Sequence, residues 1–321
     1  MDGGMMAKEI VLALGGGGLR GIAHLGVLRC LEENGYKVKG IAGTSIGALI
    51  GALYASGASL KEIDSIVEKF TTKPSFNRKP GDEAAFLGHA LIEELLNEFF
   101  QDRLIEDFPI KFVATAANLD TEREVVLSSG KAVDAVLTAI AIPGIFPARK
   151  TNGGLIIDGG VLNPIPVGLA RQLNSALPVV AVCLYKKNLE EANYETSLPF
   201  ESLVPKRLSQ RFTHNRYYEA LSILTRSVDL MLDRMADATL LIDKPDVLIT
   251  PLVGHYRLLD YVIPTDLRKR GYDAMDQQLG QLEQSLDFVK TLMRVAKYVD
   301  SSDELESTIN PLPASQEGNQ C

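Results

Sequence analysis

A serine lies at the centre of the motif Gly43-Thr44-Ser45-Ile46-Gly47, between an apolar run and a segment rich in small residues. A G-x-S-x-G pattern between a strand and a helix is typical of a sharp turn that presents the serine side chain outward, and its flanking glycines relieve crowding. At the helix N-terminus, the helix dipole favours negative charge that develops on a reacting oxygen. The motif therefore predicts Ser45 as a nucleophile, with Gly43 and Gly47 as supporting residues.

A second motif, Gly16-Gly17-Gly18-Leu19-Arg20-Gly21, follows the apolar residues 9–14. Consecutive glycines let several backbone N–H groups point at one centre, where they bind an anion. In a serine hydrolase that anion is the tetrahedral oxyanion, so Gly16, Gly17 and Gly18 are predicted to form the oxyanion hole. Arg20 either braces this glycine loop or binds a phosphate, and the sequence leaves both roles open.

The third segment, Asp158-Gly159-Gly160, follows the apolar residues 155–157. A hydroxyl nucleophile needs a base at neutral pH, and a carboxylate that leaves a buried strand before two glycines has room for a neighbour. Histidine is the other common base, and the chain has four. His24 and His89 are predicted to be packing residues, whereas His214 and His255 stay open as alternative bases.

Taken in this order, GGGLRG (16–21), GTSIG (43–47) and DGG (158–160) resemble the patatin-like phospholipases, particularly their bacterial branch. Residues 141–167 also resemble the family's segment that leads into its catalytic aspartate, and the resemblance extends over residues 8–185. It implies a Ser–Asp dyad of Ser45 and Asp158, with the glycine loop as oxyanion hole. It also implies hydrolysis of acyl esters of phospholipids, lysophospholipids or neutral lipids, without a metal or a nucleotide cofactor. Gly15 departs from the plant members, which carry Asp before the glycines.

The elements that must position these segments alternate between strand and helix. Aliphatic runs predict strands over residues 9–14, 38–42, 112–117, 124–127, 155–157, 179–184 and 247–250. This alternation predicts an α/β fold of three layers, α/β/α, with a mostly parallel central sheet. Each catalytic segment follows a predicted strand, and ligand sites of open α/β sheets collect at the carboxyl ends of strands. We expect one acyl hydrolase domain over residues 1–300 and a disordered acidic tail over residues 301–321.

Two sets of apolar residues have more than one interpretation. A helical stripe is formed by Tyr217, Leu221, Leu224, Val228, Met231 and Met235. Core burial is the favoured interpretation, and contact with the site, a membrane or a second subunit is left open. Ile142, Phe146 and the pair Phe99-Phe100 are candidates for the wall of an acyl site, although core packing is favoured for each. Helical spacing also predicts a helix over residues 273–299.

Composition limits the partners and the compartment. The formal net charge is −8 over 321 residues, which argues against nucleic acid as the main partner. Hydrophobic contact with a membrane surface stays open, and the oligomeric state is not indicated. Three widely spaced cysteines indicate a reducing compartment, and the N-terminal residues do not read as a secretory signal. We therefore expect a cytoplasmic protein, peripheral at a membrane if it acts on bilayer lipid.

Two alternative functions remain. Gly16, Gly18 and Gly21 also fit the G-x-G-x-x-G fingerprint of dinucleotide-binding domains. That fingerprint needs an acidic residue at the end of the second strand, where this chain has the serine motif instead, so this alternative is disfavoured. The other alternative is a non-catalytic patatin-like scaffold or regulator, which only a measurement of turnover distinguishes.

Overall fold

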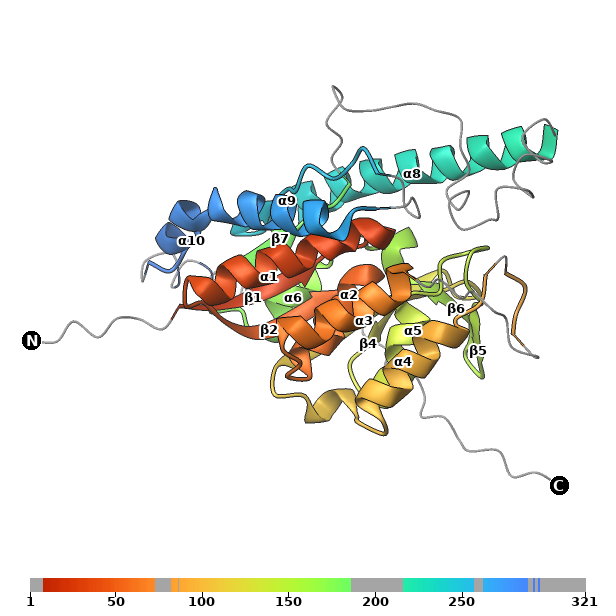
Figure 1. Cartoon of the computed structure of the whole chain (residues 1–321), viewed down its shortest axis with the longest axis horizontal. Coiled ribbons are helices and arrows are strands. Elements are labelled where there is room, and N and C mark those ends of the chain that lie inside the picture. The colour runs from red at the N-terminus through yellow and green to blue at the C-terminus, as the bar shows by residue number, and fades with distance from the viewer. Residues whose placement is uncertain are drawn as a thin grey trace, which may run out of the picture.

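A mixed eight-stranded sheet forms the middle layer of the protein (Figure 1). The computed structural model describes residues 8–72, 82–85, 87–185, 216–256, 262–287, 291 and 294. The strands are β1 (Glu9–Leu14), β2 (Lys37–Gly43), β3 (Lys111–Asn118), β4 (Arg123–Leu127), β5 (Arg149–Thr151), β6 (Gly154–Asp158), β7 (Val179–Val182) and β8 (Val247–Ile249). Each strand is hydrogen-bonded to the next along the path β5-β6-β3-β2-β1-β7-β8, and β4 also pairs with β3. β1, β2, β3, β7 and β8 are parallel, whereas β4, β5 and β6 pair in antiparallel fashion.

Helices cover both faces of the sheet, and strand β1 shows why. Ile10, Leu12 and Leu14 lie in one core cluster, whereas Val11 and Ala13 lie in the other, because successive side chains of a strand point to opposite faces. The first face packs under α1 (Ala23–Glu33), α2 (Ile46–Ala55), α3 (Leu60–Thr72), α4 (Ala90–Phe100) and α5 (Ala132–Ala139). The second packs under α6 (Val167–Leu173) and α8 (Arg216–Ile242). The predicted three-layer α/β/α fold is thus confirmed.

Helix α8 packs on the sheet through a different stripe from the predicted one. Leu232, Ala236 and Leu240 pack against the second core cluster. The prediction of core burial is wrong for Leu224, Val228 and Met231, which are 59%, 44% and 64% exposed. α8 carries two apolar stripes, and the sequence pattern does not indicate which one meets the sheet. Figure 1 shows α8 as one long helix on the outside of the molecule.

The helix predicted over residues 273–299 is wrong at its start. Helix α9 (Pro264–Asp276) begins earlier and ends before α10 (Leu279–Ser285). A Cβ added at Gly26 of α1 would lie 1.9 Å from the Arg268 carbonyl oxygen, and one at Gly271 would lie 1.9 Å from the Ala23 carbonyl oxygen. The backbones of α9 and α1 therefore lie in close contact at these two glycines. Contact of this kind does not produce a periodic pattern of apolar residues, so the sequence did not indicate where α9 begins. Residues 288–290, 292–293 and 295–299 lie outside the described residues, as does the predicted tail at 301–321.

Candidate active site

Ser45 occupies a strained turn between β2 and α2. Its backbone angles are φ 55° and ψ −123°, and it is the N-cap residue of α2. A positive φ at a residue with a side chain costs free energy, and such residues concentrate at functional sites. The turn is tied to β1, because the Thr44 N–H donates to the Leu14 carbonyl at 3.0 Å. A Cβ at Gly47 would lie 2.1 Å from that same carbonyl oxygen, so the turn requires glycine there.

Asp158 reaches the turn from the opposite direction to the one expected. The carboxyl ends of β1 and β2 lie at one edge of the sheet, but β6 runs antiparallel to β3. Gly43 at the end of β2 pairs with Ala114, and Asp158 at the end of β6 pairs with Ala116. β6 therefore begins near the carboxyl end of β3, runs back along β3, and ends at Asp158 near the serine turn. The three segments converge as predicted, although not as three parallel strand ends.

The Asp158 carboxyl group is buried and only partly hydrogen-bonded. Its residue is 4% exposed, and Oδ1 accepts a hydrogen bond from the Gly160 N–H at 2.8 Å. Burial raises the pKa of Asp158 to about 6, while the Ser45 hydroxyl and the Gly160 N–H act to lower it. Oδ2 is buried, and no residue in the described part of the chain makes a hydrogen bond of good geometry to it. The Ser45 hydroxyl therefore lies close enough to this carboxyl group to lower its pKa.

The glycine loop offers fewer free donors than its three glycines suggested. The Gly16 N–H donates to the Pro164 carbonyl at 3.0 Å, so it is already occupied. Gly17 and Gly18 have φ angles of 153° and 57°, a region that favours glycine. No backbone acceptor for either N–H appears among the described contacts. A Cβ at Gly21 would lie 2.3 Å from an Ile46 side-chain carbon, so the loop packs directly against the start of α2.

A further backbone donor was not predicted from the sequence. Ile46 is the first residue of α2, and the first N–H groups of a helix have no acceptor within the helix. In a strand-to-helix serine turn, the N–H of the residue after the serine is a usual oxyanion donor. The G-x-S-x-G motif itself carried this signal, because it fixes Ile46 as that residue.

Arg20 is positioned inside the fold. Its side chain is buried, and Nε donates to the Gly17 carbonyl at 3.0 Å. Of the two roles left open by the sequence, this contact supports bracing of the glycine loop.

Two hydrogen-bonded threonine hydroxyl groups connect the serine turn to β3 and to the segment after Asp158. Thr115 Oγ1 of β3 donates to Thr44 Oγ1 at 3.0 Å, and Thr44 Oγ1 donates to the Asn163 carbonyl at 2.8 Å. A Cβ at Gly159 would lie 2.2 Å from Thr115 Oγ1, so the segment after Asp158 packs on the same threonine. Thr115 thus links the serine turn to the aspartate segment. No sequence pattern indicates this link, since a threonine in a strand is ordinary.

The described histidines make contacts with residues other than Ser45 and Asp158. Nε2 of the buried His24 is 2.9 Å from the Gly15 carbonyl oxygen, and His89 stacks on Phe146 with ring centroids 4.9 Å apart. Burial lowers the pKa of both to about 4, so both are neutral at pH 7. The packing role predicted for His24 and His89 agrees with these contacts. His255 packs against the Tyr256 ring, and His214 lies outside the described residues.

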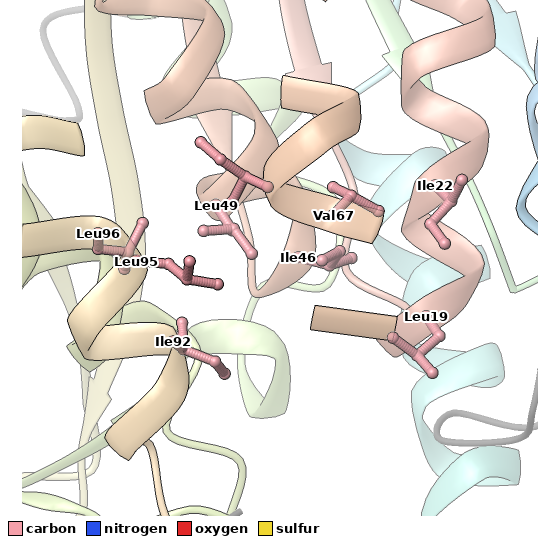
Figure 2. Close-up of a pocket in the computed structure, with 9 residues that line it drawn as sticks. Leu19, Ile22, Ile46, Leu49, Val67, Ile92, Leu95 and Leu96 are labelled. Carbon is pink, nitrogen blue, oxygen red and sulfur yellow. The ribbon is translucent and has the colours of Figure 1, made fainter. Parts of the chain in front are cut away.

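An apolar pocket opens beside the serine turn (Figure 2). Ile46 follows Ser45 directly, and Leu19 follows the three glycines of the loop. Figure 2 shows Ile46 and Leu49 of α2 between the side chains of α4 and those at the start of α1. All lining residues are aliphatic: Leu19, Ile22, Ile46, Leu49, Ile66, Val67, Ile92, Leu95 and Leu96.

The four residues considered for such a wall, Ile142, Phe146, Phe99 and Phe100, have the favoured role of core packing. Phe100 and Phe146 are buried in the main core, and Phe99 and Ile142 pack against it. None of the four lines the apolar pocket.

Within the described residues, no group of three His, Cys, Asp or Glu side chains is arranged to hold a metal ion. In the same part of the chain, no helix is long and apolar enough to cross a bilayer.

Comparison with known proteins connects this geometry to one family. Residues 12–171 match the family model described as patatin-like phospholipase. An uncharacterized NTE family protein, Mb1092c, of Mycobacterium bovis is 34% identical over 178 residues, which cover 55% of this chain and 49% of that protein. A protein named lysophospholipase NTE1, from Pyricularia oryzae, is 30% identical over 175 residues, which cover 53% of this chain and 12% of that protein. The chain thus matches about half the length of the mycobacterial relative and a much smaller share of the fungal one.

A solved structure supports the fold over a longer span. VipD from Legionella pneumophila superposes with a TM-score of 0.52 at 14% sequence identity. The match covers 86% of this chain and 67% of VipD. It extends the structural likeness beyond the residues that the family model matches.

Proposed function

Because residues 12–171 of this chain belong to the patatin-like phospholipase family, we propose that the protein is a serine acyl hydrolase. It cleaves carboxylic ester bonds of phospholipids, lysophospholipids or related lipids, with Ser45 as nucleophile and Asp158 as base. One observation carries this proposal: the buried Asp158 Oδ2 has no hydrogen-bond partner within the described ranges, although its carboxyl group is close enough to the Ser45 hydroxyl for the hydroxyl to lower its pKa. A buried polar atom without a partner is rare and needs an explanation. Acceptance of the Ser45 proton provides one.

In the acylation step, Asp158 Oδ2 takes the proton of the Ser45 hydroxyl while Oγ attacks the ester carbonyl carbon. The tetrahedral intermediate collapses to an acyl-serine, and the protonated Asp158 returns its proton to the leaving alcohol oxygen. In the second step Asp158 takes a proton from water, whose oxygen attacks the acyl-serine. The free acid leaves and Ser45 regains its proton, so the enzyme ends in its starting state.

The oxyanion hole is formed by backbone N–H groups of Gly17, Gly18 and Ile46. The Gly16 N–H contributes to the loop's position through Pro164 instead. The α2 N-terminus adds its dipole at the same point. Donors of this kind stabilise a developing oxyanion, and removal of one costs about 3 kcal/mol of transition-state stabilisation in a well-studied protease.

The apolar pocket receives the acyl chain. Its aliphatic lining matches a hydrocarbon, and its lining residues Ile46 and Leu19 directly follow Ser45 and the three glycines in the sequence, which supports this role. The centre of a water-sized sphere can move through only about 20 Å³ of the pocket, which is room for about one such sphere and not for an extended acyl chain. Entry of a chain therefore needs movement of the lining side chains on α3 and α4.

The test is fluorophosphonate labelling of the purified protein, combined with hydrolysis of p-nitrophenyl esters of increasing chain length. We expect Ser45 to be labelled and medium or long chains to be preferred. Ser45→Ala should lose labelling, and Ser45→Ala and Asp158→Ala should each lower kcat at least about a thousandfold. Ser56→Ala is the matched control, because the buried Ser56 hydroxyl donates to the Leu53 carbonyl at the far end of α2.

A folded protein without labelling or turnover would favour a non-catalytic scaffold. Labelling that persists in Ser45→Ala would assign the nucleophile to another residue. Near-normal turnover in Asp158→Ala would remove Asp158 as the base.

A further inference from the structure

Arg20 is a buried cation that contacts the oxyanion loop. Its residue is 2% exposed, and its guanidinium carbon lies 5.4 Å from the centroid of the Tyr185 ring. Its Nε donates to the Gly17 carbonyl oxygen at 3.0 Å. A buried charge is costly unless a countercharge accompanies it. The position of Arg20 therefore depends on what balances its charge.

The countercharge is Asp229, which lies far from Arg20 in the sequence. Asp229 on α8 places Oδ1 3.8 Å from Arg20 Nη2. In the part of the chain that the structure describes, Asp229 is the one carboxylate within ion-pair distance of this guanidinium. Nη2 is buried and has no hydrogen-bond partner among the described residues, so the electrostatic pairing with Asp229 is its main compensation.

The contact between Arg20 and Gly17 fixes one peptide unit of the loop. The Gly17 carbonyl and the Gly18 N–H belong to the same planar trans peptide, so they point in opposite directions. When Arg20 holds the carbonyl, it aims the Gly18 N–H. The flanking residues are glycines with φ angles of 153° and 57°, which place little steric restriction on rotation of this peptide.

We propose that Asp229 is a positioning residue for the oxyanion hole, acting through Arg20 on the peptide between Gly17 and Gly18. This inference rests on the proposed function, since it assigns that peptide to oxyanion binding. It also gives α8 a role in catalysis, although α8 contributes no group to the reacting atoms. Loss of the Asp229 charge leaves Arg20 unbalanced and frees the peptide to rotate.

The test compares Asp229→Asn with Asp233→Asn, one helical turn further along α8, which makes the same change of charge. We expect Asp229→Asn to lower kcat for a p-nitrophenyl ester about tenfold, which is less than the roughly 10²–10³-fold decrease known for loss of a whole donor, because the Gly18 N–H is misaimed rather than removed. KM should change less than about twofold, because the effect lies in the transition state. Asp229→Glu should restore part of kcat, and Asp233→Asn should behave like the wild type.

A double-mutant cycle separates this pathway from a general loss of structure. In an Arg20→Ala background, Asp229→Asn should cause no further decrease in kcat, because the residue through which it acts is gone. Wild-type kcat in Asp229→Asn, or full additivity with Arg20→Ala, would overturn the inference.

A readout independent of turnover distinguishes this inference from the proposed function. The amide ¹H and ¹⁵N shifts of Gly18 should change in Asp229→Asn and stay unchanged in Asp233→Asn. Unchanged Gly18 shifts in both variants would refute the positioning role, whether or not the wild type hydrolyses esters. Absence of ester hydrolysis by the wild type, with shifted Gly18 resonances in Asp229→Asn, would instead reject only the catalytic use of the loop.

Discussion

Ser45 and Asp158 approach each other from opposite directions along one edge of β3. Ala114 pairs with both Gly43 of β2 and Leu127 of β4, so β2 and β4 lie on opposite edges of β3. β4 continues along its edge past Ala116, which also pairs with Asp158. β6 must therefore share the edge that β2 occupies. The last residues of β2 and β6, Gly43 and Asp158, pair with Ala114 and Ala116, two residues apart on β3. This brings Ser45 and Asp158 close together.

The first prediction concerns the pH dependence of turnover. Burial raises the pKa of Asp158 to about 6, and only its ionised form accepts the Ser45 proton. We expect kcat/KM for a p-nitrophenyl ester to be constant above pH 7 and to fall about tenfold per pH unit below about 6. A pH–rate profile between 4.5 and 8.5 checks this. An acid limb centred near pH 4 would contradict the raised pKa of the base.

The second prediction concerns stability. The pKa of Asp158 is higher in the folded protein than its ordinary value of 3.8, so the folded state binds the extra proton. The wild type should therefore lose stability as pH rises from about 4 to about 6. Asp158→Asn removes this loss and should be more stable than the wild type at pH 8, by up to about 3 kcal/mol.

Urea unfolding of both proteins at pH 4.5 and pH 8 measures this difference. The advantage of Asp158→Asn should shrink at the lower pH, where the wild-type carboxyl group becomes protonated. Asp233→Asn on α8 serves as the control for general charge effects. An advantage that grows toward low pH would have the wrong sign and would refute the linkage.

The third prediction concerns the acyl pocket. Leu49 and Leu53 are one turn apart on α2 and both are buried, but only Leu49 lines the pocket. Alanine at either position should cost about 2–5 kcal/mol of unfolding free energy. Only Leu49→Ala should change the chain-length preference, with kcat/KM rising for long or branched acyl groups relative to butyrate. Equal chain-length profiles in the two variants would place the acyl chain elsewhere.

The fourth prediction concerns the hydroxyl chain under the serine turn. Thr115→Val removes the donor to Thr44 Oγ1 and should cost about 1–2 kcal/mol of stability. It should also lower kcat about tenfold or more, because a small displacement of a nucleophile has a large effect on rate. Thr138→Val is the control, since the Thr138 hydroxyl donates to the Asp134 carbonyl within α5. Activity of Thr115→Val equal to that of Thr138→Val would remove the positioning role of Thr115.

Local residue patterns were sufficient for much of the fold. β1 and β2 appear where aliphatic runs predicted them, because a buried parallel strand needs apolar side chains on both faces. Gly43 to Gly47 form the predicted turn, since glycine at both ends is a local steric requirement. The predicted stripe on α8 was less informative. An apolar stripe shows only that a helix can pack, and a second stripe on α8 packs instead.

The sequence by itself thus determined the layer architecture and the segments that carry Ser45, Asp158 and the glycine loop. Only the tertiary structure decided that β6 runs antiparallel and that the Gly16 N–H is already bonded to Pro164. It also decided that Asp229 pairs with Arg20. The physical reason is the range of the interactions. Turn sterics and strand polarity act between neighbours in sequence, whereas strand pairing, burial and ion pairing join residues that only the folded chain brings together.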